Sequence, residues 1–488
     1  MEDTEVIKAR LALNMIRTKK NEDDLEDCEP VSPVGRIFLK PLLNCYVICL
    51  FGCKEEINVQ MLKKNVENSP LFKHKRFSSL VKEDSKGKLR WVPTKANIDD
   101  HIIIPEIDPT INKSLDFCDE YAAKLATAPP LDPSKPLWQL HVLNIKSAEA
   151  AATMILRAHH CLGDGMSLIS LCFACAHKAN DPKSLPTIPR PARRPTKHIS
   201  LVSFMFLSFC RFILMMFYTF VDLLRLVATI LNILKDSNTP IKGSTGVGYM
   251  PKRLAHVNFG LEDVKTIKNA VNGTVNDVFL GTLAAGLVRY LDRIYVSGGQ
   301  TMPSNLLVRL LTPVNIRPTP GLQALKDMEN EKGQCRWGND LGLFIVSVPM
   351  DKYEDPLDYA RAATAICNKK KSSLEMYICN LIKLLPGQIG EYVSSNLTGN
   401  TTLTFSNTVA PEEEVDFFGQ RLTYIAPTTV GLPHSLAVYF MSYMGNVTLM
   451  VTAAKEVMPD PKQLCLDCLE ALGYMKQAAI ATSKRLTC

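Results

Sequence analysis

The residues best suited to chemistry lie in one short string, His159-His160-Cys161-Leu162-Gly163-Asp164-Gly165. A histidine side chain has an ordinary pKa of about 6.5, so it is largely neutral near pH 7 and can accept a proton. We expect His160 to act as a general base that removes the proton from a substrate hydroxyl. Asp164 is expected to hold the turn through an arginine or backbone donors, and Gly163 and Gly165 to relieve backbone strain.

The segments on either side of this string predict how the histidines are positioned. Residues 153–158 form a short apolar run with β-branched side chains, which is typical of a strand, and residues 166–177 have helical periodicity. The histidines therefore lie at a strand-to-helix transition, where a reactive side chain can be both fixed and exposed. The alternative is a core histidine with satisfied hydrogen bonds, and for His159 we prefer that structural role.

Length and composition favour a two-domain enzyme that contacts lipid. The 488 residues exceed what one hydrophobic core usually serves. The chain is 46% hydrophobic and 22% charged, with a mean hydropathy of +0.02, which is apolar for a soluble enzyme and too polar for a multi-span membrane protein. The net charge of +7 suits an anionic membrane surface or an anionic substrate, and no nucleic-acid-binding motif accompanies it.

The 15 cysteines are scattered through segments that otherwise predict core, which indicates a reducing compartment without disulfides. Two Cys-x-x-Cys pairs, Cys172/Cys175 and Cys465/Cys468, lie far apart without histidine partners, so we expect them in the core rather than on a metal. The N-terminal residues lack the basic start and apolar run of a signal peptide, which predicts a cytosolic catalytic body.

Composition shifts divide the chain into four parts. We expect a polar segment over 1–30, a first α/β domain over 31–181 that carries the histidine string, a linker with a hydrophobic helix over 182–245, and a second α/β domain over 246–488. Further strands are predicted at 46–51, 138–143, 306–314, 344–348 and 401–407, with a hairpin turning at Gly445-Asn446. Further helices are predicted at 59–66, 261–271, 276–291 and 461–476.

The hydrophobic run over 199–234 contains only three charged residues, Arg211, Asp222 and Arg225. Its first part, 199–221, has the length of about 20 apolar residues that a membrane span needs. Arg211 lies near the middle of that part, and an intramembrane arginine costs at least about 2.5 kcal/mol. A helix that lies in or dips into the bilayer is therefore favoured, while a span and a buried helix stay open.

The string from Arg157 to Leu168, Arg-Ala-His-His-Cys-Leu-Gly-Asp-Gly-Met-Ser-Leu, resembles the active-site motif of the wax ester synthase/diacylglycerol acyltransferase family. Members of that family are bifunctional O-acyltransferases of bacteria and plants. Other pieces agree in order and cover nearly the whole chain: Ser32-Pro33, Pro136-Leu137-Trp138-Gln-Leu-His141, Asn276-Asp277-Val278, Pro313-Val-Asn315-Ile-Arg317, Gly338-Asn339 and Phe405-Ser406-Asn407-Thr408. The hydrophobic stretch after a Pro-rich linker resembles the eukaryotic branch.

The resemblance implies an α/β fold of two chloramphenicol-acetyltransferase-like domains, similar also to the condensation domains of peptide synthetases, with the active site at their interface. His160 matches the base of the motif, and Asp164 matches the residue that holds its loop. The acyl-CoA and the alcohol would enter a tunnel from opposite sides. Trp138 matches a segment thought to line a substrate pocket, although a tryptophan entering a strand is by default core.

Two later motifs carry weaker implications. Asn276-Asp277 resembles a helix start, where such residues ordinarily cap the helix. Ser406 and Asn407 form a polar pair at a strand end that could donate hydrogen bonds to a tetrahedral oxyanion. The family usually continues Ser-Asn with Val or Ile and Pro-Gly-Pro, whereas this chain continues with Thr408-Val409-Ala410-Pro411 and lacks the glycine. That departure weakens the oxyanion assignment.

From the motif and the resemblance we expect an O-acyltransferase that moves a fatty acyl group from acyl-CoA to a long-chain alcohol, giving a wax ester. Diacylglycerol is expected as a second acceptor, membrane lipid as a partner, the endoplasmic reticulum membrane as the location, and acyl-CoA as co-substrate without a cofactor or metal. The alternative is a lipid-binding membrane protein of the same fold that has lost turnover. The chain lacks both the Asp-Phe-Gly-Trp-Gly element of the plant secondary-metabolism acyltransferases and the Gly-x-Ser-x-Gly elbow of lipases.

Overall fold

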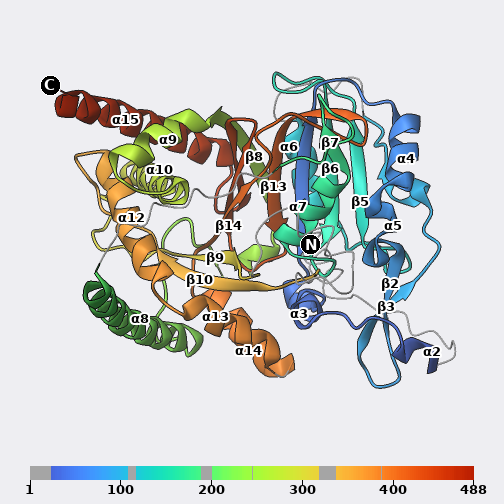
Figure 1. The fold of residues 1–488 in the computed structure, drawn as a ribbon, viewed down its shortest axis with the longest axis horizontal. Coiled ribbons are helices and arrows are strands. Elements are labelled where there is room, and N and C mark those ends of the chain that lie inside the picture. Colours follow the sequence, from blue (N-terminus) through green and yellow to red (C-terminus); the bar gives the residue numbers. More distant parts are fainter. Residues whose placement is uncertain are drawn as a thin grey trace.

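A computed structural model describes residues 23–107, 117–187, 200–244, 246–317, 337–385 and 387–487. Two large β-sheets lie side by side in it, each covered by helices (Figure 1). Most of the expected polar segment, residues 1–22, and most of the Pro-rich linker, residues 188–199, lie outside the described residues.

The first sheet has seven strands in the order β4-β5-β6-β1-β13-β12-β7. Its strands are β1 (Tyr46–Cys53), β4 (Ile102–Ile103), β5 (Trp138–Leu143), β6 (Ala152–His159), β7 (Ala176–Lys178), β12 (Val415–Phe417) and β13 (Gln420–Val430). Strands β1 and β6 are buried along their whole length, as expected for central strands with apolar residues on both faces. Strands β12 and β13 come from late in the chain, so the two halves of the sequence share this sheet.

The second sheet has six strands in the order β10-β9-β11-β14-β15-β8. These are β8 (Lys252–Gly260), β9 (Arg309–Asn315), β10 (Leu341–Ser347), β11 (Leu403–Val409), β14 (Leu436–Tyr443) and β15 (Asn446–Ala454). Strands β14 and β15 form an antiparallel hairpin, and β11 pairs in parallel with β14. A separate hairpin joins β2 (Ser79–Glu83) to β3 (Leu89–Pro93).

Helices cover the two sheets and line their common edge. The described α-helices are α2 (Asp23–Glu26), α3 (Pro33–Phe38), α4 (Val59–Asn68), α5 (Pro70–Lys73), α6 (Phe117–Thr127), α7 (Gly165–Ala174), α8 (Leu201–Ile230), α9 (Leu261–Ala270), α10 (Val275–Ser297), α12 (Leu357–Lys371), α13 (Glu375–Asn380), α14 (Gly387–Gly399) and α15 (Pro461–Thr487). Single 3-10 turns are η1 (Pro41–Leu43), η2 (Lys75–Ser78), η3 (Ile98–Asp100), η4 (Val247–Tyr249) and η5 (Leu381–Leu384).

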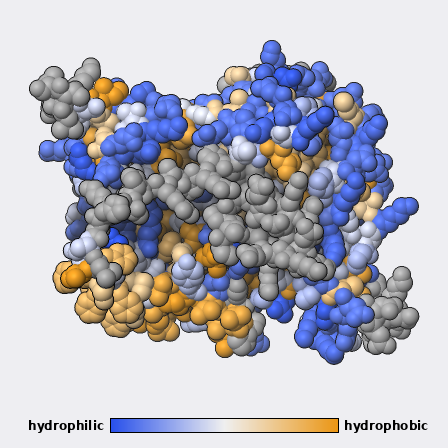
Figure 2. All heavy atoms as spheres, viewed as in Figure 1, coloured by the Kyte–Doolittle hydropathy of each residue, from blue (hydrophilic) through white to orange (hydrophobic). Residues whose placement is uncertain are grey.

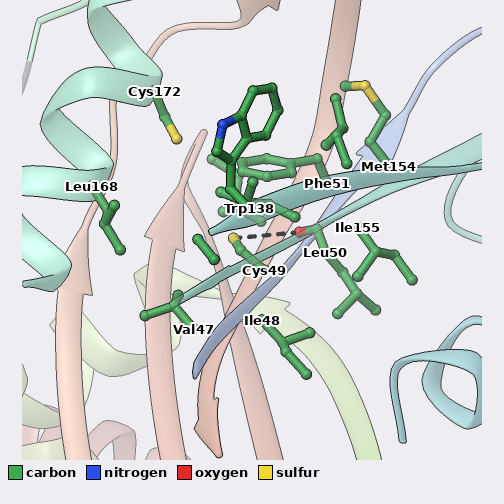
Figure 3. Close-up of a cluster of buried hydrophobic side chains, with 14 of the residues drawn as sticks. Val47, Ile48, Cys49, Leu50, Phe51, Trp138, Met154, Ile155, Leu168 and Cys172 are labelled. Atoms are coloured by element: carbon green, nitrogen blue, oxygen red, sulfur yellow. Dashed lines mark hydrogen bonds between the residues drawn. The ribbon is translucent and has the colours of Figure 1, made fainter. Parts of the chain in front are cut away.

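Alternation along β1 gives the first core two faces. Val47, Cys49 and Phe51 point to one face, together with Leu168 and Cys172 of α7, while Ile48 and Leu50 point to the other (Figure 3). A second core of buried side chains lies between the second sheet and α9, α10, α12 and α15. The first core extends onto the second sheet through Leu254, Met441 and Met450, and the site described below lies beside it between the two sheets.

The predicted strands and helices are confirmed, with shifts at several ends. The helix expected over 166–177 ends at Ala174, because β7 begins at Ala176 and pairs with β12 from a distant part of the chain. The hairpin turn lies at Met444-Gly445, both with positive φ, and Asn446 already belongs to β15. Both Cys-x-x-Cys pairs are buried core residues, as predicted.

Candidate active site

His160 lies directly after the end of β6, where the first sheet meets the second. Its backbone N–H donates to Cys45 O at 2.9 Å, which extends the pairing of β6 with β1 by one residue. The side chain packs against the ring of Phe38, with ring centroids 4.4 Å apart. Only 8% of His160 is exposed, so the ring is shielded from bulk water.

Asn339 determines which ring nitrogen of His160 carries the proton. The Asn339 Nδ2 donates to His160 O at 3.0 Å, so its Oδ1 faces the ring and lies 3.1 Å from His160 Nδ1. Because an amide oxygen can only accept, Nδ1 carries the hydrogen and Nε2 keeps its lone pair. Burial lowers the pKa of His160 below its ordinary value, although Asp164 and Asn339 oppose this shift. The ring is therefore a neutral base whose Nε2 is available.

His159 is held in the core and does not share this role. Its Nε2 lies 3.0 Å from Asn44 Oδ1, and its Nδ1 accepts a hydrogen bond from Cys161 N at 3.1 Å. The ring packs edge-on against Tyr46. Burial lowers the pKa of His159 to about 3, so it stays neutral. Both ring nitrogens are occupied, which supports a structural role.

Asp164 links the motif to the second sheet. Its side chain does not face the space next to the His160 ring. Its Oδ1 accepts from Ser167 N at 2.9 Å, which makes it the N-cap of α7. Its Oδ2 accepts from Arg317 Nη2 at 2.8 Å and from Asp340 N at 2.9 Å. Asp164 and Arg317 both have side chains only 3% exposed. The expected arginine is therefore Arg317, and the carboxylate links α7, the end of β9 and residues 338–340.

Only Gly163 of the two glycines in the motif is needed for space, and the expectation that they relieve backbone strain is wrong. Neither has a φ in the left-handed region. A Cβ at Gly163 would lie 3.0 Å from the Ser167 Cβ and 3.4 Å from the Trp337 ring. A Cβ at Gly165 would meet no atom within 4 Å, because Gly165 borders the cavities beside the motif.

Three neighbouring cavities that share lining residues lie between the two sheets, and His160 lines two of them; together we call them the passage. One, of about 370 Å³, lies beside Asp164 and Gly165 and reaches Asn276 and Lys371. A second, of about 110 Å³, lies under β1, β13 and α7. A third, of about 170 Å³, is lined by α3, α13, η5 and α14. Pro313 and Leu341 border all three, so the cavities are neighbours.

Ser406 and Asn407 lie on β11 and face this passage. Ser406 lines both the 370 Å³ and the 110 Å³ cavity, and Asn407 lines the larger one. The Asn407 Oδ1 is buried and has no hydrogen-bond partner among the described residues. The predicted polar pair is therefore at the domain interface, on the same side of the motif as Asp164, but it lies in the middle of β11 and not at a strand end as predicted.

Trp138 is not brought into this passage. It is 1% exposed, its Nε1 donates to Phe77 O at 2.9 Å, and its ring stacks on His101 with centroids 4.3 Å apart. It lines a separate void of about 10 Å³ in the first core. At the start of α10 the N-cap is Thr274, and Asp277 completes a capping box with it, while Asn276 lines the 370 Å³ cavity.

Comparison with known proteins assigns the chain to a family. A model described as "Wax ester synthase/diacylglycerol acyltransferase catalytic domain" matches residues 59–279, and one described as "WS/DGAT C-terminal domain" matches residues 337–476. "Wax ester synthase/diacylglycerol acyltransferase 11" of Arabidopsis thaliana is 37% identical over 95% of this chain and 97% of its own. The chain belongs to the wax ester synthase/diacylglycerol acyltransferase family. The Arabidopsis relative numbered 2 is also 37% identical, over 92% of this chain and 96% of its own.

Solved structures agree with this family at the level of the fold. A wax ester synthase/diacylglycerol acyltransferase from Marinobacter aquaeolei VT8 has a TM-score of 0.58 with 14% identity, covering 92% of this chain and 99% of that one. The first condensation domain of the CDA synthetase has a TM-score of 0.53 with 12% identity, covering 93% and 96%. The expected condensation-domain-like α/β fold is therefore confirmed.

Sequence reasoning missed two residues that complete the site of this family member. Asn339 orients His160, and Arg317 pairs with Asp164, yet neither was assigned a role. Both lie in segments that carried the family resemblance, Pro313 to Arg317 and Gly338-Asn339. Gly338 has a φ of 123°, which favours glycine, and its carbonyl accepts from Arg317 and Ser167. The family resemblance pointed to both segments. It did not indicate that Arg317 and Asn339 contact a motif more than 150 residues earlier in the chain.

Proposed function

We propose that this protein transfers a fatty acyl group from acyl-CoA to a long-chain alcohol and so forms a wax ester, with diacylglycerol as a weaker acceptor. The observation that carries the proposal is the unprotonated Nε2 of His160, held by Asn339 in a passage between two sheets. Family membership supports the same chemistry, since the relatives are named for wax ester synthesis and diacylglycerol acylation.

The reaction requires one proton to move from the alcohol to His160 and then from His160 to the leaving thiolate. His160 Nε2 takes the proton of the alcohol as its oxygen attacks the thioester carbonyl, which gives a tetrahedral oxyanion. The C–S bond then breaks, and the imidazolium returns the proton to the CoA thiolate. Ser406 and Asn407 are the candidates for donors to the oxyanion. The balanced reaction consumes only acyl-CoA and the alcohol, so we propose no further cofactor.

The two ends of the passage differ in character, which supports opposite entrances. The 370 Å³ cavity is bordered by Asn276 and by Lys371, whose side chain is 47% exposed, and suits the polar, anionic CoA. The 170 Å³ cavity is bordered mainly by Val, Ile, Leu and Phe side chains and suits an alkyl chain. A linear alcohol brings one such chain, whereas diacylglycerol brings two on a branched backbone, so the smaller cavity favours the alcohol.

The proposed location is the endoplasmic reticulum membrane, with the catalytic body on the cytosolic side. The described cysteines are all free thiols, which suits a reducing compartment. One helix, α8, is long and apolar enough to contact a bilayer.

The test expresses the protein in a cell that makes no neutral lipid and separates labelled wax esters from triacylglycerols. We expect wax esters to predominate with the wild type. His160→Ala should lower their formation by about 10²- to 10⁴-fold, the usual contribution of a general base. His177→Ala, an exposed histidine on β7, is the matched control and should leave activity unchanged.

Two results would contradict the proposal. Undiminished product from His160→Ala would remove this residue from the mechanism. A folded wild type that binds acyl-CoA but forms neither ester would favour the lipid-binding alternative.

A further inference from the structure

Helix α8 presents a long apolar surface to solvent. Phe204, Phe209, Phe212, Phe217 and Phe220 are each more than half exposed. In Figure 2 apolar residues gather along the lower edge of the molecule, over α8, α13 and α14. Exposed apolar patches of this extent on a protein mark a site that another apolar phase covers.

The apolar surface continues from α8 onto its neighbours. Helices α13 and α14 both contact α8 (Figure 1). Leu381 and Leu384 of η5 are 55% and 68% exposed, and Ile389 and Tyr392 of α14 are 52% and 54% exposed. We call the exposed apolar residues of α8 together with these four residues the membrane face.

One stripe of α8 is bound to the second domain by polar contacts. Asp222 accepts from Lys370 Nζ at 2.8 Å, and Thr219 Oγ1 accepts from Leu374 N at 3.0 Å. At the penultimate residue of the helix, Thr229 Oγ1 accepts from Arg309 Nη1 at 2.6 Å. These positions recur at helical spacing on one face, so the last third of α8 is attached along the protein surface.

The topology is incompatible with α8 as a single span. Strand β7 precedes α8 and pairs with β12, which follows it, and β13 lies next to β1. The chain on both sides of α8 therefore belongs to one folded body, whereas a lone span would put the two parts on opposite sides of the membrane. The part before Thr219 is also short: residues 202–218 reach roughly 25 Å as a helix, less than the hydrocarbon core of about 30 Å.

The charges on α8 suit the headgroups of one leaflet. Arg211 and Arg225 are exposed, while the acidic residue of the helix, Asp222, is buried against Lys370. Exposed cations beside an apolar face are typical of helices that lie in the membrane interface, where they meet lipid phosphates. A second protein would be less well matched by so many flexible and aromatic side chains around two exposed positive charges, for which the described part of the chain supplies no salt bridge.

Side chains directly beneath the membrane face line the 170 Å³ cavity that His160 borders. Leu311, Cys379 and Leu397 form a cluster with Leu226 of α8, and the same three residues line the 170 Å³ cavity. Ile382 of η5 and Ile37 of α3 also line it and are partly exposed, so the cavity reaches the surface between these elements. One layer of side chains thus separates the apolar surface from the space beside the base.

We propose that the membrane face binds one leaflet of a bilayer, with α8 lying in the interface rather than crossing it, and that the uncharged lipid substrate enters the His160 cavity from that leaflet between α3, η5 and α14. Membrane binding stands on the geometry alone. The entry route rests on the proposed function.

The first experiment measures flotation of the purified full-length protein with phosphatidylcholine vesicles that contain some phosphatidylserine. Leu384→Glu with Tyr392→Glu alters η5 and α14, and Phe209→Glu with Phe220→Glu alters α8. Each pair should weaken binding at least about tenfold, or about 1.4 kcal/mol, because carboxylates are costly in an apolar phase. The matched control, Val296→Glu with Leu466→Glu, changes similarly exposed residues on α10 and α15 and should bind as the wild type does.

The second experiment compares turnover of hexadecanol held in the vesicles with turnover of octanol in solution. The Leu384/Tyr392 variant should lose the first in proportion to binding and keep most of the second, with its thermal unfolding unchanged. The membrane face is contradicted if that variant binds vesicles as well as the wild type does. It is also contradicted if the wild type forms a dimer and does not float. Equal hexadecanol turnover despite lost binding overturns the route. A wild type that floats but esterifies neither alcohol overturns the proposed function and leaves the membrane face standing.

Discussion

His160 is oriented by an amide and not by a carboxylate, and this sets how its pKa responds to the site. The Asn339 Oδ1 fixes the proton on Nδ1 without adding a negative charge. Burial can then lower the pKa of His160, which keeps the base unprotonated at and below neutral pH. The pKa of a histidine base depends on the charges that lie nearest its ring.

Asn339→Asp should therefore move the acid side of the pH profile. The wild-type base is free at all pH values above its lowered pKa, so kcat should stay constant as pH falls through 6.5 and should decline only as pH approaches that lowered pKa. A carboxylate at position 339 favours the imidazolium and raises that pKa, so activity should begin to fall at a higher pH. Initial rates from pH 5 to 8 measure this. Asn339→Ala is the control, because losing the amide should lower kcat without the same shift, and superimposed profiles for wild type and Asn339→Asp would contradict the assignment.

The residues that can be predicted are those whose partners are near in sequence. His160 and Asp164 follow from a compact motif between an apolar strand and an apolar helix, and the cap of α7 follows from the same string. Asn339 and Arg317 could not be assigned, because their contacts with the motif join segments that only the fold brings together. Trp138 is a case of the general rule that a tryptophan entering a strand is core.

At the scale of elements, one buried ion pair holds three segments in register. Arg317 Nη2 bonds Asp164, Ser167 and Gly338, so α7, the end of β9 and residues 338–340 meet on one guanidinium. The loop that carries Asn339 is thereby tied to the helix that follows His160. Many helix and strand positions were predicted from periodicity, although strands such as β8 and β13 and helices such as α12 and α14 were missed. The junction could not be predicted, since periodicity carries no information about which ends meet.

Arg317→Met should destabilise the protein by about 3–5 kcal/mol, because it leaves the Asp164 carboxylate buried without its counter-ion. Urea unfolding monitored by tryptophan fluorescence measures the change. Adding Asp164→Asn should recover part of the loss, since asparagine still caps α7 but carries no charge. Arg36→Met, at an exposed position on α3, is the control and should change stability little. A double variant no more stable than Arg317→Met would show that lost packing, not the unpaired charge, dominates.

At the scale of the whole molecule, the two sheets are joined both by the chain and by charge. Strands β12 and β13 return to the first sheet after most of the second has been formed. His256 of β8 bonds two carboxylates on the side of the first sheet. Its Nδ1 lies 2.7 Å from Asp119 Oδ1 of α6, and its Nε2 lies 3.0 Å from Glu149 Oε2. The shared sheet was not predicted, because β12 and β13 were not recognised as strands and because patterning does not show which strands pair. The His256 cluster could not be predicted either, because its three residues are far apart in sequence and form no recognisable motif.

This cluster makes the stability of the whole fold depend on pH in a specific direction. Burial opposes charge on His256, but Asp119 and Glu149 outweigh it and raise the pKa of His256 to about 10. A raised folded pKa stabilises the protein fully below the unfolded value of about 6.5 and ceases to do so as pH rises through about 10. His256→Gln should therefore cost a few kcal/mol at pH 6, since each pKa unit corresponds to about 1.4 kcal/mol. The difference between wild type and variant, measured by urea unfolding, should shrink steadily from pH 6 to pH 10, whereas His177→Gln at an exposed position should show no such trend. A difference that stays constant over this range would mean that His256 is neutral in the folded protein and that packing alone joins the two sheets there.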